Sequence, residues 1–346
     1  MNRRRLLLAG FASAAVVGAV YAYALPQLAS YASVWRLVRG LGGWWIAGLL
    51  AVTAVDLLTY ALPWLVALPG LRLLEALKMT QASTAFGLVM PGGAPLGMAA
   101  SFAMLRSRGF SRSAVTSAVA LTGLWSQVST FLFPVVGLAL LAAEGTVSAT
   151  LRLLAGVGLA VSLLLVGAVV GVLWRAEVAA RAGDRAASLA SRVRALVGRA
   201  PVGWNGGALA RYRAELLVLL HRRWRSLTVA TLANQLTGYL MLELSIRAVG
   251  IDRHQVAVAE SFAAWSIGRL LSSLPITPGG LGFVELGLTG TLVGFGGPSA
   301  RVVAAVLVYR VLSIVPTLAL GLLATLTWRR HQQEPLADRS KRTRPK

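Results

Sequence analysis

Long apolar runs separated by short basic loops dominate this chain. A helix of about 20 apolar residues crosses the hydrocarbon core of a bilayer, so runs of that length predict membrane-spanning helices. Six ranges have this character: 6–25, 43–66, 113–142, 150–174, 226–249 and 299–328. The first of them is long for a signal peptide, which favours an uncleaved helix. Trp and Tyr gather near the ends of these ranges, as they do at membrane interfaces. The pattern predicts an all-α polytopic membrane protein.

Two further apolar segments are interrupted by turn-forming residues. Pro275 to Glu285 reads PITPGGLGFVE, and a weaker counterpart, Met90 to Gly97, reads MPGGAPLG. Such breaks free backbone groups that hydrocarbon cannot satisfy, so they are tolerated only against protein or a water-filled cavity. Matching breaks in two halves of a chain indicate an inverted-repeat transporter. We therefore expect two re-entrant hairpins, over roughly 80–105 and 255–297, the first with arms of about ten to twelve residues.

Composition supports the membrane assignment. The 346 residues are 56% hydrophobic and 13% charged, whereas soluble proteins carry about 25% charged residues. The net charge of +22 could indicate a nucleic-acid partner, but the basic residues lie in short loops between apolar runs. Cytoplasmic loops that follow the positive-inside rule explain this charge, and we expect no nucleic-acid partner.

The distribution of charge orients the chain. With a cytoplasmic amino terminus, the segments expected inside carry 26 Lys and Arg, and those expected outside carry six. This bias predicts cytoplasmic amino and carboxyl termini. It also gives the hairpins opposite orientations, so the halves 1–145 and 146–328 form an inverted repeat within a single membrane domain. The basic connector 175–225 is predicted to be a solvated link or an amphipathic helix that binds anionic lipid head groups, and 329–346 a disordered tail.

Five ionisable side chains at membrane depth form the candidate site: Arg310, Glu285, Arg269, Glu243 and Asp56. A charge at the bilayer centre costs about 2.5–3.5 kcal/mol on insertion scales, so each one needs a reason to be there. One reason is structural, with Asp56 and Glu243 as ion-pair partners of the arginines. The other is a polar cavity in which arginines hold a phosphate and carboxylates bind an amine or carry protons. The turn residues of the two breaks complete this site: Pro278, Gly279, Gly280, Gly282, Pro91, Gly92 and Gly93.

Signs of enzymatic chemistry are absent from the sequence. There is no cysteine, which removes thiolate catalysis and thiolate metal sites. His221, His254 and His331 are far apart and lack metal-ligand spacing. No P-loop is present, and the Gly-rich break follows no predicted strand. We expect neither catalysis nor a cofactor or metal.

The residues around the second break resemble one known family. TPGGLG at 277–282, followed by Glu285, resembles the signature of flippase-like proteins related to the transmembrane region of lysylphosphatidylglycerol synthase. Met90 to Gly97, followed by RSRG at 106–109, resembles the counterpart in the first half. The resemblance covers most of the chain. It implies an integral membrane protein that moves or handles lipids with phosphate-containing head groups, and it carries Glu285 over as a functional acid.

Two departures from that family limit the analogy. The stretch Leu96 to Ala100 has no acid where the family often has Gly-Glu, so the role of that carboxylate is not carried over. Only a short tail follows the last predicted helix, where full synthases have a soluble aminoacyl-transferase domain. We therefore do not expect lipid aminoacylation by this chain.

The leading interpretation is a lipid translocator that works by alternating access. Its expected partners are a phospholipid or a polyprenyl-phosphate lipid, together with anionic head groups at the cytoplasmic face. The oligomeric state stays open. An accessory protein or intramembrane transferase in lipid-linked glycan assembly is the alternative, and a small-solute carrier or partner-binding scaffold is a third interpretation.

Overall fold

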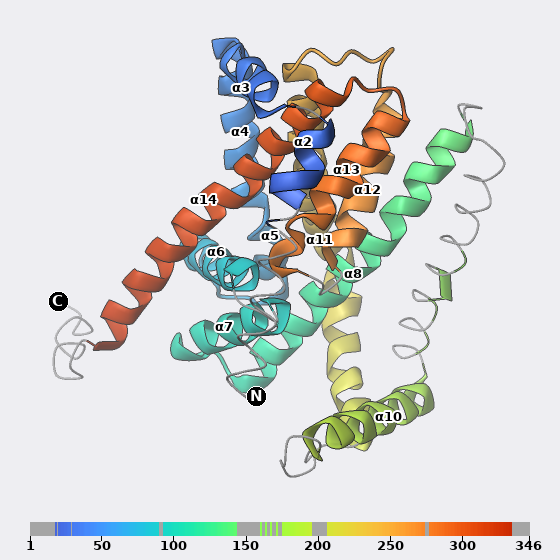
Figure 1. Cartoon of the computed structure of the whole chain (residues 1–346). Helices are drawn as coiled ribbons and strands as arrows, with labels where there is room; N and C mark the ends of the chain where they lie inside the picture. The colour runs from blue at the N-terminus through green and yellow to red at the C-terminus, as the bar shows by residue number, and fades with distance from the viewer. Residues whose placement is uncertain are drawn as a thin grey trace.

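The structure is a computed structural model, and every element that it describes is helical (Figure 1). It describes residues 18, 20–28, 30–89, 93–143, 160, 163–164, 167, 171, 175–195, 206–273 and 277–333. The chain begins with η1 (Val20–Ala24), α2 (Leu25–Leu28), α3 (Tyr31–Arg39), α4 (Gly43–Thr59) and α5 (Leu62–Ala67). Then follow α6 (Leu73–Val89), α7 (Gly93–Ser107), α8 (Arg112–Ala143) and α10 (Ala176–Ala195). The last elements are α11 (Gly206–Ala248), α12 (Val258–Ser273), η2 (Pro278–Gly280), α13 (Phe283–Gly294) and α14 (Ser299–Gln333).

Three helical stretches of the described chain are long and apolar enough to cross a membrane. They are Gly43–Ala67, Arg112–Ala143 and Ser299–Trp328, and they match three of the predicted spans. The span predicted at 226–249 is helical too and forms the end of α11. With 43 residues α11 is long enough, but it is not among the helices apolar enough to cross a membrane. The spans predicted at 6–25 and 150–174 lie largely outside the described residues. The predicted class, an all-α fold with membrane-compatible helices, is confirmed.

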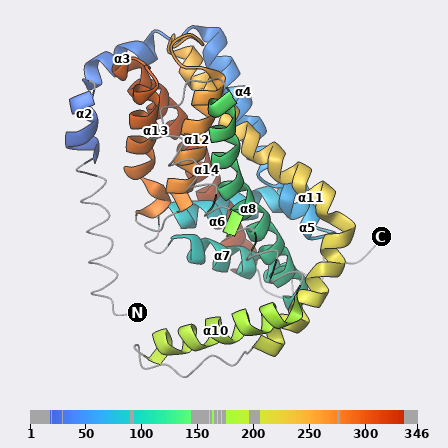
Figure 2. The same cartoon turned by 90° about the vertical axis from the view of Figure 1, so that its right-hand side faces the viewer.

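α11 is one continuous helix across residue 225, where we expected the basic connector to end and a membrane-spanning helix to begin. Its 43 residues give a length of about 64 Å. The described parts of the predicted connector 175–225 are therefore mostly helical, and α10 packs against α11 (Figure 2). Arg223, within the predicted basic connector, donates from Nη1 to Val66 O at 2.8 Å. This bond ties α11 to the end of α5.

Two helical hairpins carry the break residues. α6 pairs with α7, and α12 pairs with α13. The arms predicted for the first hairpin were too short, because α6 begins at Leu73 rather than near residue 80. α6 has 17 residues and α7 has 15, which correspond to lengths of about 26 and 22 Å. Arm length therefore does not by itself make this hairpin re-entrant.

α14 supports both hairpins. Val302 to Val306, in its first half, share an apolar cluster with Leu288 of α13. Ala324, near its end, shares a second cluster with Met79 of α6. The two hairpins therefore pack on α14 on either side of Arg310.

The tips of the two hairpins meet. η2, at the turn between α12 and α13, contacts α6, and Leu88 of α6 lies directly against Gly279. Figure 2 shows the lower ends of α12 and α13 beside α6. The end of α6 thus meets the second break, which is far from it in the chain.

Close packing around α6 predicts that two glycines cannot be enlarged. A Cβ at Gly97 of α7 would lie 2.6 Å from Ser83 O, and one at Gly321 of α14 would lie 2.6 Å from Gln81 O. Both oxygens belong to the α6 backbone and cannot move independently. Gly97→Ala and Gly321→Ala should each destabilise the fold by about 1–3 kcal/mol, as overpacking does. Thermal unfolding in detergent measures this effect.

Gly290→Ala in α13 is the matched control, because a Cβ there meets nothing within 4 Å. It should be neutral or slightly stabilising, since alanine favours a helix more than glycine does. Equal unfolding temperatures for all three variants would contradict the described packing of α6.

Candidate functional site at the second break

The second break is a turn that requires glycine. Gly279, Gly280 and Gly282 have φ angles of 62°, 67° and 88°, in the left-handed region that residues with a Cβ rarely adopt. Thr277 Oγ1 donates to Leu281 O at 2.8 Å across the turn. The TPGGLG sequence therefore forms a tight, internally bonded connection between α12 and α13.

Glu285 caps the helix that follows this turn. Its Oε2 accepts from Gly282 N at 2.7 Å, which is the backward contact of a capping box. A carboxylate in the first turn of α13 also interacts favourably with the helix dipole. The side chain is completely buried. Its other oxygen, Oε1, accepts from Arg310 Nε at 2.6 Å and from Tyr21 Oη at 3.0 Å.

Arg310 joins α14 to both sides of the turn. In addition to its bond to Glu285, it donates from Nη2 to Gly279 O at 3.2 Å. That carbonyl lies in the break, where regular helical bonding stops and hydrocarbon offers no donor. Arg310 is only 9% exposed, so each charge of the pair depends on the other. Both residues were predicted from their depth, and the structure places them in direct contact.

Asp56 and Arg269 belong to a second polar group beside this pair. Asp56 Oδ1 accepts from Thr237 Oγ1 at 3.0 Å. Tyr309, the chain neighbour of Arg310, lies within electrostatic range of Asp56, Arg269 and Arg310. No ion pair joins Asp56 to Arg269 within the described residues. The structure thus brings four of the five predicted ionisable residues into one region.

Three buried donors in this region lack an acceptor among the described residues. They are Arg269 Nε, Trp265 Nε1 and Gln235 Nε2. Arg269 follows Trp265 by one turn of α12. Gln235 lies about one turn of α11 before Gly238, and Gly238 lies against the Trp265 ring. Tyr309 lies near the Trp265 indole but without the geometry of a hydrogen bond. Buried donors are almost always bonded to protein or water, so this set indicates a missing acceptor. Sequence analysis missed Gln235 and Trp265 because neither carries a charge.

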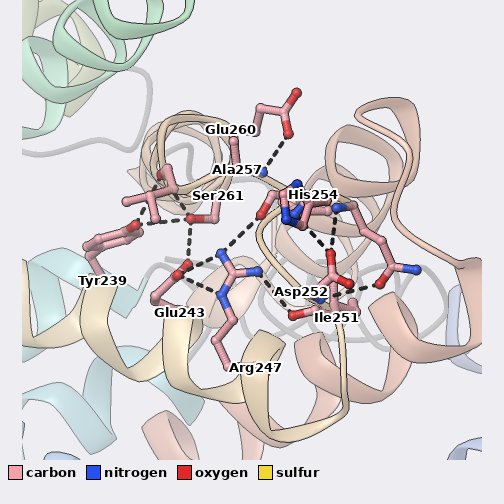
Figure 3. Close-up of polar contacts among 12 residues, drawn as sticks. Tyr239, Glu243, Arg247, Ile251, Asp252, His254, Ala257, Glu260 and Ser261 are labelled. Atoms are coloured by element: carbon pink, nitrogen blue, oxygen red, sulfur yellow. Dashed lines mark hydrogen bonds and ion pairs between the residues drawn. The ribbon is translucent and has the colours of Figure 1, made fainter.

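Glu243 belongs to a different network, at the loop between α11 and α12 (Figure 3). Arg247 Nη2 lies 2.7 Å from Glu243 Oε1, and Ser261 Oγ donates to Oε2 at 2.6 Å. Arg247 also donates to the carbonyls of Ile251 and Val256, each at 3.0 Å. Glu243 therefore holds this loop, and its described contacts do not reach the break. The i, i+4 spacing of Glu243 and Arg247 was the signal in the sequence that could have revealed the pair.

The remaining predicted residues are in the first break. Pro91 and Gly92 lie outside the described residues, and Gly93 begins α7. In the part of the chain that the structure describes, no three His, Asp or Glu side chains gather as a metal ion would require.

A family model described as the lysylphosphatidylglycerol synthase TM region matches residues 7–321. The chain belongs to this family. The match covers both breaks and all of the polar groups described above, and it confirms the resemblance found in the sequence. A comparison with curated proteins finds no match. Membership of the family, together with the apolar helices, indicates a membrane protein with a lipid-related function.

Removing one member of the Arg310–Glu285 pair should leave a buried, unpaired charge. Arg310→Met and Glu285→Gln are each expected to destabilise the fold by about 3–5 kcal/mol. The double variant Glu285→Gln/Arg310→Met should recover part of this loss, because it removes both charges and a Gln oxygen can still accept from Gly282 N, whereas the Gly279 carbonyl loses its donor. Unfolding in detergent measures all three variants. A double variant whose loss equals the sum of the two single losses would show that the charges are not coupled.

Proposed function

We propose that this protein binds and translocates a phosphate-containing lipid by alternating access, with the head group held at the junction of the two hairpins. The observation that carries the proposal is the buried Arg310–Glu285 pair, which lies at a backbone break where η2 meets α6. Transporters build ligand sites from interrupted helices and buried charges of this kind. Family membership supports a lipid as the ligand.

The proposal includes a placement in the membrane. The protein is multi-pass with both termini in the cytoplasm, as the bias of Lys and Arg between loops supports. The halves 1–145 and 146–328 are inverted relative to each other. The packing of the two hairpins on opposite parts of α14 supports entry from opposite faces.

The unpaired donors suit a phosphate. Arg269 Nε, Trp265 Nε1 and Gln235 Nε2 each need an acceptor, and in the described residues Arg310 Nη1 has none either. Ionised phosphate oxygens accept hydrogen bonds, and bonds between charged partners are the strong ones. A head-group phosphate in this region would therefore pair these donors. Asp56 lies within electrostatic range of the same region, where it would attract an amine of the head group.

Alternating access requires the hairpin tips to separate. Leu88 meets Gly279 through apolar side-chain atoms, and no hydrogen bond joins α6 to η2 among the contacts described. Opening at this junction therefore breaks no polar interaction of the described chain. Transport of this kind needs no chemical step on the protein, so we propose a carrier and not an enzyme.

Translocation of a fluorescent phospholipid in proteoliposomes tests the proposal. Arg310→Ala and Glu285→Gln should abolish translocation, but both also weaken the fold. The decisive variant is therefore Glu285→Gln/Arg310→Met, which should be more stable than either single variant and still lose transport. Arg269→Gln should lower the rate roughly 10- to 100-fold, the effect of one charged hydrogen bond. It should cost less stability than Arg310→Ala, because Arg269 forms no ion pair at contact distance within the described residues.

Arg247→Gln is the matched control, since Arg247 belongs to the loop network of Glu243. It should lower stability while the folded fraction still transports. Rates equal to wild type in both Arg269→Gln and the double variant would contradict the site. Lipid redistribution that is the same with and without the wild-type protein would contradict translocation itself. Formation of a glycosylated product from a polyprenyl-phosphate sugar donor would favour the transferase alternative.

A further inference from the structure

A pocket is lined by residues of α6, α7 and the end of α14, together with residues that adjoin these helices. Its lining residues on α14 fall between 324 and 328, about 20–27 Å along that helix from Arg310. The pocket is therefore separate from the Arg310–Glu285 site. In the predicted topology it belongs to the cytoplasmic side of the membrane.

The rim of this pocket is basic. Lys78 and Arg108 line it together with one acid, Glu75. Arg108 is paired with Glu75, whereas Lys78 is half-buried and has no hydrogen-bond or ion-pair partner among the described residues. A partly desolvated ammonium without a partner favours an anionic ligand, because pairing offsets its lost hydration.

The floor of the pocket is apolar. Met79 and Leu105 line it and are buried. Leu74 of α6 and Leu323 of α14, the chain neighbours of the lining residues Glu75 and Ala324, are 62% and 58% exposed, which suits contact with acyl chains. Trp328 lines the same pocket, and Trp is enriched at the level of lipid head groups. A basic rim beside exposed leucines matches an amphiphile better than a free inorganic anion.

We propose that this pocket binds the phosphate of an anionic phospholipid through Lys78 and Arg108, with the acyl chains along the exposed leucines. The lipid bound here is not the transported one. It bridges the α6–α7 hairpin to the end of α14, because the pocket is lined by all three helices. Glu75 weakens the site by occupying Arg108 and by repelling the phosphate. The inference rests on membrane insertion and not on translocation.

Binding of phosphatidylglycerol to the full-length protein in detergent, followed by native mass spectrometry, tests this site. Phosphatidylcholine is the zwitterionic comparison and should bind more weakly. Lys78→Gln should weaken phosphatidylglycerol binding about tenfold, through loss of one charged contact. Glu75→Gln should strengthen it about threefold, because Arg108 becomes free and a like charge is removed. These opposite signs distinguish a built site from a general effect on folding.

Arg253→Gln is the matched control, because it makes the same change of charge at an exposed position of the loop between α11 and α12. It should bind phosphatidylglycerol as the wild type does. An equal loss in Lys78→Gln and Arg253→Gln would overturn the proposal by assigning binding to net charge. Phosphatidylcholine binding as tightly as phosphatidylglycerol, or inorganic phosphate competing at concentrations as low as those of the lipid, would also overturn it. The double variant Glu285→Gln/Arg310→Met should retain this binding, so the two proposals can fail separately.

Discussion

The fold around the second break depends on one constraint: a backbone that leaves the helical pattern inside a membrane must find its hydrogen-bond partners within the protein. Arg310 and Glu285 meet this constraint together. Glu285 accepts the Gly282 N–H, Arg310 donates to the Gly279 carbonyl, and the two side chains bond to each other. The charges are needed because neutral side chains of that length would satisfy the backbone less strongly. The pair is neutral as a whole, which lowers the cost of burying it.

This arrangement makes α14 the element that relates the two hairpins. Its first half packs on α13 and its second half on α6. Arg310, between these two contacts, binds the turn of the α12–α13 hairpin, and the end of α6 contacts the same turn. A shift of either hairpin relative to α14 therefore changes the surroundings of the same charged pair. That coupling is what a carrier with one central site requires.

Two polar networks in this protein both contain charged side chains, but they differ in whether their buried donors have acceptors. Around Glu243 and Arg247, described donors meet acceptors in the loop between α11 and α12, so this network fixes structure. Around Arg269, buried donors have no acceptor within the described parts of the chain. A complete network needs nothing further, whereas an incomplete one in a membrane is expensive unless a ligand or water completes it. The same reasoning separates the paired Arg108 from the unpaired Lys78 at the end of α6.

The sequence by itself determined the class of the protein, three spans that meet the criteria of length and polarity, and the two breaks, because apolar length and turn residues act locally. It also marked Glu285 and Arg310, because a charge in an apolar run is conspicuous. Only the tertiary structure decided that these two residues pair, that Tyr21 joins them, and that Glu243 bonds elsewhere. Pairing depends on the rotation and register of helices that are remote in the chain. The sequence also could not predict that the Gln235 and Trp265 donors lack acceptors among the described residues, because the hydrogen bonding of a neutral donor depends on its neighbours in space. The structure also decided that α11 is continuous, because a helix can run from a basic segment into an apolar one with no turn residue between them.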